Sequence, residues 1–371
     1  MANSPIYSQQ KQQNKCLNPS GFEIRRGVNL SHWLSQDFGW APKYTYISEM
    51  DIKFIDSIGY DHVRIPIDEQ EMWDNSGTPI KEAFTHLTNC LEWCAKYNLR
   101  AIIDLHIVRA HHFNAGNDGT TNTLWTDPAA QNNLVNLWVQ LSGVLHKYSN
   151  KMVAYEILNE AVAPSHDDWN KLMNKAVAVI RKLEPERVLV IGANMWQFAS
   201  NLQYLKLPEG DKNIILSFHT YTPMAFTHYK ADWVPMKYYK GTVHYPGQII
   251  TTEDYKAYVD PNNTPLVTQT SDAKEIFNKE RLFQVFKDGV EFAKSKNLQL
   301  YCGEFGCMPT VDRKDRLAFY NDMISALEEH DIAWCNWEYK GDFGIYFFDA
   351  KKTKSLKPDF DLIHILLKDK K

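Results

Sequence analysis

Short β-rich runs alternate with longer amphipathic stretches about eight times along this chain of 371 residues. Such alternation is typical of parallel strands joined by helices, and at this length it predicts a closed (β/α)8 TIM barrel of the α/β class. The expected strands are Arg25–Ser31, His62–Ile67, Arg100–His106, Val153–Glu160, Arg187–Ala193, Ile214–Tyr221, Leu298–Gly306 and Ile332–Tyr339. Apolar residues at helical spacing predict helices over Pro79–Tyr97, Trp169–Leu183, Glu280–Lys296, Asp312–Glu329 and Asp359–Lys368. We expect one barrel domain at 22–371, preceded by a flexible lead-in at 1–21.

Two connections are long enough to suggest a function. The segment Thr222–Ser271, after the sixth strand, shows little regular pattern, and long loops in compact domains tend to be functional. Its aromatic residues, Trp233 among them, favour a wall or lid over a substrate, with a self-packed surface insertion as the alternative. A second long loop, His111–Thr126, follows the third strand and contains Trp125.

Polar and aromatic side chains stand at the carboxyl ends of seven expected strands, where TIM-barrel active sites lie. In strand order they are Asn29, His32 and Trp33; Arg64; Asp104 and His106; Asn159 and Glu160; His219 and Tyr221; Glu304; Trp337 and Glu338. Seven strand ends of this kind are hard to explain by packing alone. Glu338 alternates away from Trp337 and is expected to be structural, with an outer subsite as the alternative.

Glu160 and Glu304 carry most of the functional information. Each follows an apolar, strand-like run, where burial normally excludes a carboxylate. A strand that ends in a charged group directs that group into a site, and two facing carboxyl groups are what glycoside hydrolysis requires. A pure salt-bridge role is the alternative.

The bulk properties exclude several classes of partner. The net charge of -4 argues against a nucleic acid or an anionic membrane. No apolar run is long enough to span a bilayer. The six cysteines show no metal-like spacing, and their redox state stays open. His106, His111 and His112 raise the alternative of a metal-dependent hydrolase, although a zinc site needs three or four converging ligands.

Several motifs together resemble one enzyme family. They are Arg26-Gly-Val-Asn-Leu-Ser-His-Trp33, Val63-Arg-Ile-Pro66, Asp104-Leu-His106, Asn159-Glu160, His219-Thr-Tyr221, Gly303-Glu-Phe-Gly306 and Trp337. In this order and on these strands they resemble glycoside hydrolase family 5, a family of cellulases, mannanases and related retaining β-glycanases. The resemblance runs from about Phe22 to the C-terminus.

The resemblance implies a role for each matched residue. Glu160 would be the general acid/base and Glu304 the nucleophile, with Arg64 beneath Glu304, Tyr221 donating a hydrogen bond to it, and Asn159 holding the sugar 2-hydroxyl. His106 and His219 would bind sugar hydroxyls or tune the acid, and Trp337 would lie beneath the reacting sugar. Further candidates for substrate binding or support are Asn29, Trp33, Trp125 and Trp233. For each of the three tryptophans, packing in the core is an equally good interpretation.

The expected function is hydrolysis of a β-linked glycan with retention of configuration, without a metal or other cofactor. A β-1,4- or mixed-linkage glucan is the first expectation, and β-1,3-glucan or mannan comes next; the loops decide between these polymers. An exo-β-1,3-glucanase or β-mannanase of the same family, a transglycosylase and a catalytically silent carbohydrate-binding barrel are the alternatives. We expect a monomer without nucleic-acid partners or membrane insertion. We expect it to be secreted, periplasmic or at the cell surface, and a cytoplasmic enzyme for short oligosaccharides is the alternative.

Overall fold

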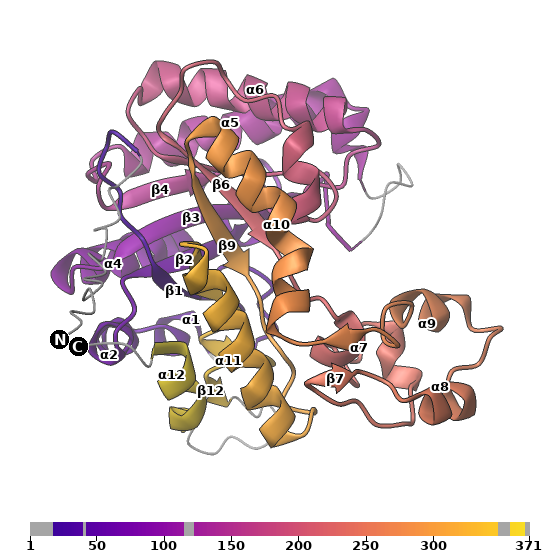
Figure 1. Ribbon diagram of the computed structural model, residues 1–371. Coiled ribbons are helices and arrows are strands. Elements are labelled where there is room, and N and C mark those ends of the chain that lie inside the picture. The colour runs from indigo at the N-terminus through magenta and orange to yellow at the C-terminus, as the bar shows by residue number, and fades with distance from the viewer. Residues whose placement is uncertain (1–17, 40–41, 115–121, 348–356, 368–371) are drawn as a thin grey trace, which may run out of the picture.

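A computed structural model describes residues 18–39, 42–114, 122–347 and 357–367, and its centre is a closed barrel of parallel strands (Figure 1). All eight expected runs form strands of this barrel. They are β1 (Arg26–Asn29), β2 (His62–Asp68), β3 (Arg100–Ile107), β4 (Val153–Glu156), β5 (Leu189–Gly192), β6 (Ile214–His219), β9 (Gln299–Glu304) and β10 (Ala333–Asn336). The barrel closes through pairing of β1 with both β2 and β10. The predicted (β/α)8 barrel is therefore confirmed.

Helices surround the barrel, and each buries an apolar face against it. The longer ones are α2 (Glu49–Ile58), α4 (Lys81–Lys96), α5 (Pro128–Leu145), α6 (His166–Leu183), α10 (Lys279–Lys296), α11 (Arg313–Glu329) and α12 (Phe360–Leu367). Shorter helical turns are α1 (Lys43–Tyr46), α3 (Glu69–Met72), η1 (Thr123–Trp125) and η2 (Ala199–Tyr204). Helix α6 begins three residues before the expected Trp169, because the Ser165 side chain caps it by accepting a hydrogen bond from the Asp168 N–H.

The barrel interior is filled differently at its two ends. At the end where the strands begin, apolar side chains pack into one cluster: Phe22, Ile24, Ile102, Ala154, Val188, Val190, Ile215, Tyr301, Ala333 and Cys335. Phe22 and Ile24 precede β1, so the chain closes this end of the barrel before the first strand begins. The charged groups described below therefore lie towards the opposite end.

The fourth strand is shorter than the expected run Val153–Glu160. Strand β4 ends at Glu156, and Asn159 and Glu160 lie in the turn that follows. Glu160 has a φ of 42°, in the left-handed region, where a strand cannot continue. The apolar pattern continues to Leu158 because the turn residues Ile157 and Leu158 are also buried.

The segment between β6 and α10 contains more regular structure than expected. It holds α7 (Met224–Thr227), η3 (Pro235–Tyr238), α8 (Thr252–Tyr258), α9 (Thr264–Gln269) and the antiparallel pair of β7 (Gly247–Gln248) and β8 (Ile276–Phe277). These elements form a lobe beside the barrel (Figure 1). Phe226, Tyr239 and Tyr245 are buried, and the Tyr245 hydroxyl donates to Asp322 of α11 at 2.9 Å. The expectation of little regular structure was wrong, because turns and short helices lack long periodic patterns.

Two further observations concern the chain as a whole. None of the helices in the described part of the chain has the length and apolar character needed to cross a bilayer. Cys90, Cys94, Cys302, Cys307 and Cys335 are buried free thiols, while Cys16 lies outside the described residues. After β10, a short parallel pair, β11 (Lys340–Gly341) and β12 (Tyr346–Phe347), leads towards α12.

Candidate active site

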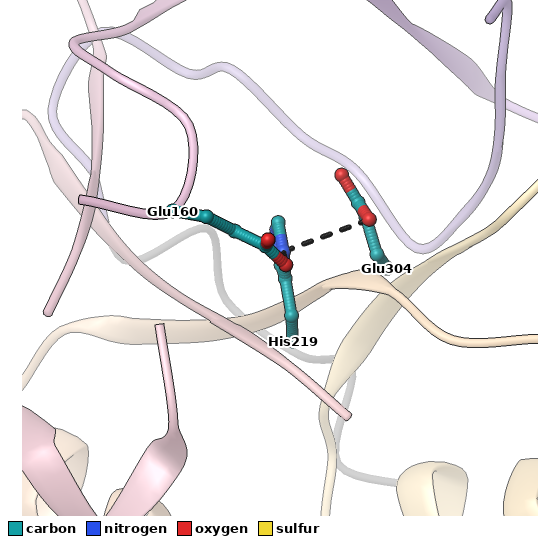
Figure 2. A group of neighbouring side chains, drawn as sticks. All are labelled: Glu160, His219 and Glu304. Atoms are coloured by element: carbon teal, nitrogen blue, oxygen red, sulfur yellow. Dashed lines mark hydrogen bonds and ion pairs between the residues drawn. The ribbon is translucent and has the colours of Figure 1, made fainter. Parts of the chain in front are cut away.

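The carboxyl groups of Glu160 and Glu304 lie close together at the carboxyl end of the barrel (Figure 2). Glu304 is the last residue of β9, and Glu160 comes from the turn after β4. One oxygen of each carboxylate and a ring nitrogen of His219 all lie within 4.8 Å of one another. Enzymes that retain configuration hold their two carboxyl groups about 5–5.5 Å apart, whereas inverting enzymes need room for a water molecule between them. This spacing fits the retaining geometry.

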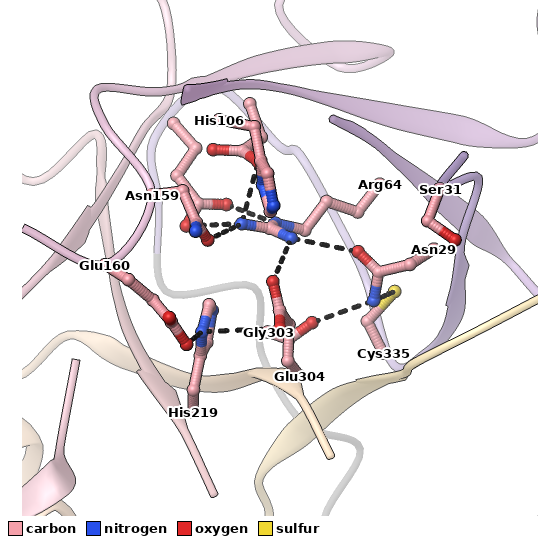
Figure 3. A network of polar contacts seen from close by, with 12 residues as sticks. Asn29, Ser31, Arg64, His106, Asn159, Glu160, His219, Gly303, Glu304 and Cys335 are labelled. Atoms are coloured by element: carbon pink, nitrogen blue, oxygen red, sulfur yellow. Dashed lines mark hydrogen bonds and ion pairs between the residues drawn. The ribbon is translucent and has the colours of Figure 1, made fainter. Parts of the chain in front are cut away.

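The guanidinium of Arg64 organises the floor of the site (Figure 3). Arg64 lies within β2 and is fully buried. Its Nη1 donates to Glu304 Oε1 at 2.7 Å, and its Nε donates to Glu156 Oε2 at 2.7 Å. Its Nη2 lies 2.9 Å from Asp104 Oδ2 and donates to Asn159 Oδ1 at 2.9 Å. One planar, five-donor group thus fixes side chains from β3, β4, β9 and the β4 turn.

The charge around Arg64 is unbalanced. Asp104, Glu156 and Glu304 all contact this single cation. Burial raises the pKa of Asp104 to about 7, against the opposing effect of Arg64. Burial also raises the pKa of Glu156. A cluster of this kind retains protons at neutral pH, because the low dielectric penalises uncompensated negative charge.

Glu160 is held by contacts outside this cluster. Its backbone N–H donates to Gln197 Oε1 at 2.8 Å, and its Oε1 lies 2.8 Å from His219 Nδ1. Burial, and then the negative charge of Glu304, raise the pKa of Glu160 well above its usual range. Burial lowers the pKa of His219 well below its usual range, so that ring is neutral. Glu160 is therefore suited to carry a proton at neutral pH.

Glu304 has the stronger support for a negative charge. Burial raises its pKa as well, but Arg64, His106 and a hydrogen bond from Tyr221 act in the opposite direction. The Tyr221 hydroxyl donates to Glu304 Oε2 at 2.9 Å. Two neighbouring carboxyls with unequal supports will divide the protonated and ionised states between them, with the proton on Glu160.

His106 and Trp337 form one side of the site. His106 Nδ1 lies 2.6 Å from Asp104 Oδ2, and burial lowers the pKa of His106 to about 4. The imidazole stacks on the indole of Trp337, with the ring planes 12° apart and the centroids separated by 5.6 Å. Trp337 also packs in a small apolar cluster with Ala231, Met308 and Phe343. These contacts hold the indole at the edge of the carboxylate site.

Asn159 offers a free donor inside the site. Its Oδ1 accepts from Arg64, which fixes the orientation of the amide. Its Nδ2 is buried and meets no hydrogen-bond partner among the described residues. A buried donor without a partner is costly, so a ligand hydroxyl or water is the expected acceptor.

Comparison with known proteins agrees with this geometry. The sequence model of the family described as "Cellulase (glycosyl hydrolase family 5)" matches residues 17–342. This chain belongs to glycosyl hydrolase family 5. It is 36% identical to Endoglucanase C of Acetivibrio thermocellus over 356 residues, covering 94% of this chain and 99% of that protein. It is 27% identical to Cellodextrinase A of Ruminococcus flavefaciens, covering 84% of each chain.

Solved structures give the same fold for this family 5 hydrolase. An endoglucanase structure superposes with a TM-score of 0.72 at 24% identity, covering 94% of this chain and 98% of that one. A second structure, described as a glycoside hydrolase, gives a TM-score of 0.75 at 22% identity, covering 94% and 100%. At these identities the likeness supports the barrel and says nothing of substrate.

Three tryptophans of the family 5 hydrolase were expected as candidates near the substrate, and the structure separates them. Trp33 is 1% exposed and donates its ring N–H to the Lys43 carbonyl, so it belongs to the core. Trp125 is also buried, and it packs edge-on against Trp169. Trp233 is 49% exposed and lies beside Phe343 with a centroid distance of 6.1 Å. Trp33 therefore packs as a core residue, while a role in substrate binding stays a prediction for Trp125 and Trp233.

Asn29 supports the strand end that carries Glu304. It is fully buried, accepts from Arg64 at 3.0 Å and donates to the Gly303 carbonyl at 3.0 Å. Glu304 follows Gly303 directly, so Asn29 links β1 to the strand end that carries the carboxylate.

The histidines considered as metal ligands have other neighbours. His111 Nε2 accepts from the Val162 N–H at 3.2 Å, and the His112 ring stacks on Phe113. His106 faces Asp104, as described above. In the part of the chain that the structure describes, the group whose ligand atoms could meet an ion is instead Glu160, His219 and Glu304. In that group, Glu160 and His219 already bond to each other.

Sequence reasoning missed two side chains that shape the site, Glu156 and Gln197. Glu156 contacts Arg64, as the nominated Asp104 does, and Gln197 holds the backbone of Glu160. Glu156 had a visible signal, since it is an acidic residue inside the apolar strand Val153–Glu156. Gln197 had none, because the loop after β5 shows no pattern that would mark it.

Proposed function

We propose that this family 5 enzyme is a retaining endo-β-1,4-glucanase that cleaves internal bonds of a β-glucan by double displacement. The observation that carries the proposal is the pair of Glu160 and Glu304, whose oxygens lie within 4.8 Å and whose supports favour opposite protonation states. The choice of substrate rests on the 36% identity to a relative named as an endoglucanase over nearly the whole of both chains.

In the first half of the reaction, Glu304 attacks the anomeric carbon and Glu160 gives its proton to the leaving glycosidic oxygen. The bond from the sugar to that oxygen breaks as the bond to the Glu304 carboxylate forms. Arg64 and Tyr221 each hold one oxygen of Glu304, which orients the carboxylate for attack. Esterification removes the negative charge of Glu304, which had helped to raise the pKa of Glu160. The pKa of Glu160 therefore falls after Glu160 has given up its proton.

In the second half, the ionised Glu160 removes a proton from a water molecule, which attacks the same carbon. The bond to Glu304 breaks, Glu304 regains its charge, and the sugar leaves with its original configuration. His219, neutral through burial, donates from Nδ1 to the ionised Glu160 in this half. We assign Asn159 Nδ2 to a hydroxyl of the reacting sugar, Trp337 to its apolar face, and His106 to the edge of the same subsite.

The chemistry needs side chains and water, and we propose that no metal takes part. Polymeric β-glucans lie outside the cytoplasm, so we also propose a secreted or surface-bound enzyme. An excess of EDTA should leave the rate unchanged. A rate that falls with EDTA and returns with a divalent cation would instead point to the group of Glu160, His219 and Glu304 as ligands.

A substrate panel tests the proposal. Carboxymethyl cellulose, mixed-linkage β-glucan, β-1,3-glucan, mannan, xylan and xyloglucan are incubated with the wild type and with Glu304→Ala, and products are sized over time. Early long fragments from the first two polymers, absent with Glu304→Ala, are expected. A single short product would mean exo action, activity confined to mannan or β-1,3-glucan would overturn the substrate, and activity retained in Glu304→Ala would overturn the nucleophile. Proton NMR should show the β-anomer first, whereas the α-anomer would mean inversion.

A further inference from the structure

A buried ion pair lies next to the indole of Trp337. His32 stands in the turn after β1 with a φ of 54°, and Glu338 follows Trp337 directly in the chain. His32 Nε2 is 3.1 Å from Glu338 Oε2. The carboxylate is fully buried, and the His32 residue is 9% exposed. The pair joins the turns that follow the first and last strands of the barrel.

The contacts of both groups indicate their charge states. His32 Nδ1 is 3.1 Å from the carbonyl oxygen of Gln36, while Nε2 faces the Glu338 carboxylate. Carbonyl and carboxylate oxygens accept hydrogen bonds, so the ring satisfies both only when both nitrogens carry protons. Glu338 in turn accepts from the Ser31 hydroxyl and from the Phe343 N–H. An imidazolium beside an ionised carboxylate satisfies this whole arrangement.

The pair touches Trp337 from two directions. Glu338 is its covalent neighbour, and the His32 ring meets the indole nearly perpendicularly, at 79° and 6.3 Å between centroids. When His32 is charged, both of its ring nitrogens are hydrogen-bonded, so the orientation of the ring against the indole is fixed. A neutral His32 would leave one nitrogen lone pair facing an acceptor, which is repulsive.

We propose that the ion pair of protonated His32 with Glu338 positions Trp337, so that glycan affinity falls when His32 loses its proton. The proposal rests on the proposed function, in which the Trp337 indole lies against the sugar. His32 and Glu338 are positioning residues here, since they act through the indole.

The surrounding charges agree with a charged His32 at neutral pH. Burial lowers the pKa of His32, but Glu338 and, more weakly, Asp342 raise it, and the net shift is upward. Burial, then Glu338 and, more weakly, Asp232 of the lobe after β6 raise the pKa of Asp342, while His32 acts in the opposite direction. On the β2 side, Asp68 accepts from the Gln36 N–H at 2.7 Å and so fixes the segment that presents its carbonyl to His32. A histidine with a raised pKa keeps its partner at low pH and loses it as pH rises through that pKa.

The test measures affinity for cellotetraose in a Glu160→Gln background, which removes the titration of the acid and slows cleavage. Dissociation constants are taken by calorimetry from pH 5 to 9. Affinity should be constant at the acid end and weaken about tenfold as His32 deprotonates, the effect of losing one charge-assisted contact. Adding His32→Gln should abolish the tenfold step seen in the parent, because the amide donates to Glu338 without titrating; Asp104, whose pKa burial raises to about 7, titrates in both proteins and cancels in the comparison. Adding Glu338→Gln should move the midpoint towards acid pH.

His330→Gln is the matched control, since His330 stacks on Phe283 away from the pair and its loss should leave the profile intact. A pH-dependent loss of affinity that is as large in His32→Gln as in the parent overturns the proposal, as does a flat profile in the parent. NMR without ligand gives a second test. The Trp337 indole N–H resonance should shift with the same midpoint as the His32 ring proton, and an indole that ignores that titration also overturns the proposal. Failure of cellotetraose to bind at any pH, with the two resonances still titrating together, would count against the proposed substrate and support the ion pair.

Discussion

Replacing Tyr221 with phenylalanine removes one atom that contacts the proposed nucleophile. The hydroxyl donates to Glu304 Oε2 at 2.9 Å, and the nearest other partner of that oxygen is His219 Nδ1 at 3.7 Å, beyond hydrogen-bond range. The phenyl ring would keep its edge-on packing against His228 and Phe343, so the fold should be unaffected. The variant therefore isolates a single hydrogen bond to a buried carboxylate.

The expected effect follows from the strength of such a bond. A hydrogen bond to a charged group contributes about 1.5–3 kcal/mol, and about 1.4 kcal/mol is a tenfold change in rate. Tyr221→Phe should thus lower kcat/KM about 10- to 150-fold if the bond acts fully on the attacking carboxylate. The hydroxyl also lowers the pKa of Glu304 by stabilising its charge. Without it that pKa rises, so the acid limb of the pH profile should move to higher pH and the loss should be largest at low pH.

The assay is the pH dependence of kcat/KM on a soluble cello-oligosaccharide, with thermal unfolding to confirm an intact fold. Tyr204→Phe is the control, because Tyr204 is 48% exposed and its ring stacks on His166. Its activity should equal that of the wild type. A Tyr221→Phe enzyme within twofold of the wild type, with an unmoved acid limb, would show that the hydroxyl does not act on the nucleophile in solution.

Three further outcomes are expected. Glu304→Ala should keep its melting temperature within a few degrees and lose at least about a thousandfold in turnover, since the covalent step has no nucleophile; near-normal turnover would contradict the assignment. Arg64→Lys should lose more than about tenfold in kcat/KM, because a lysine cannot reproduce the fork that reaches Glu156 and Glu304 together; full activity would show that the fork is dispensable. Wild-type kcat/KM should fall as pH rises through the raised pKa of Glu160, because the acid is then ionised; in Glu160→Gln that alkaline limb should vanish, and its survival would assign the limb to another group.

The barrel could be predicted from the sequence because its signal is local. Each strand is a short apolar run and each long helix an amphipathic one, so neighbouring residues suffice to place them. The end of β4 could not be placed in this way. Glu160 adopts its φ of 42° in a turn where Gln197, 37 residues further along the chain, accepts from its N–H. A contact over that distance leaves no trace in the local pattern.

The same distinction applies to the site. Residues at strand ends could be nominated, because a parallel barrel brings all its carboxyl ends to one face. Packing separates these residues: Trp33 and Trp125 carry the same side chain as Trp337, yet they pack in the main core cluster and Trp337 packs in the small cluster beside the site. An aromatic residue after a strand does not reveal which way its ring faces. Glu156 was overlooked because it lies within the expected strand Val153–Glu160 and not at its end. It acts through its contact with Arg64.

The two carboxyls differ because the fold holds them in different ways. Glu304 ends a barrel strand, and its oxygens are fixed by Arg64 from β2 and by Tyr221 after β6, both of which stabilise its charge. Glu160 stands on a turn, held through its backbone by Gln197 and through its side chain by His219, which burial keeps neutral. The first arrangement favours an anion, and the second leaves a carboxyl free to gain and lose a proton. A substitution that alters the β2 and β6 contacts should therefore affect mainly the acid limb of activity, and one that alters Gln197 or His219 mainly the alkaline limb.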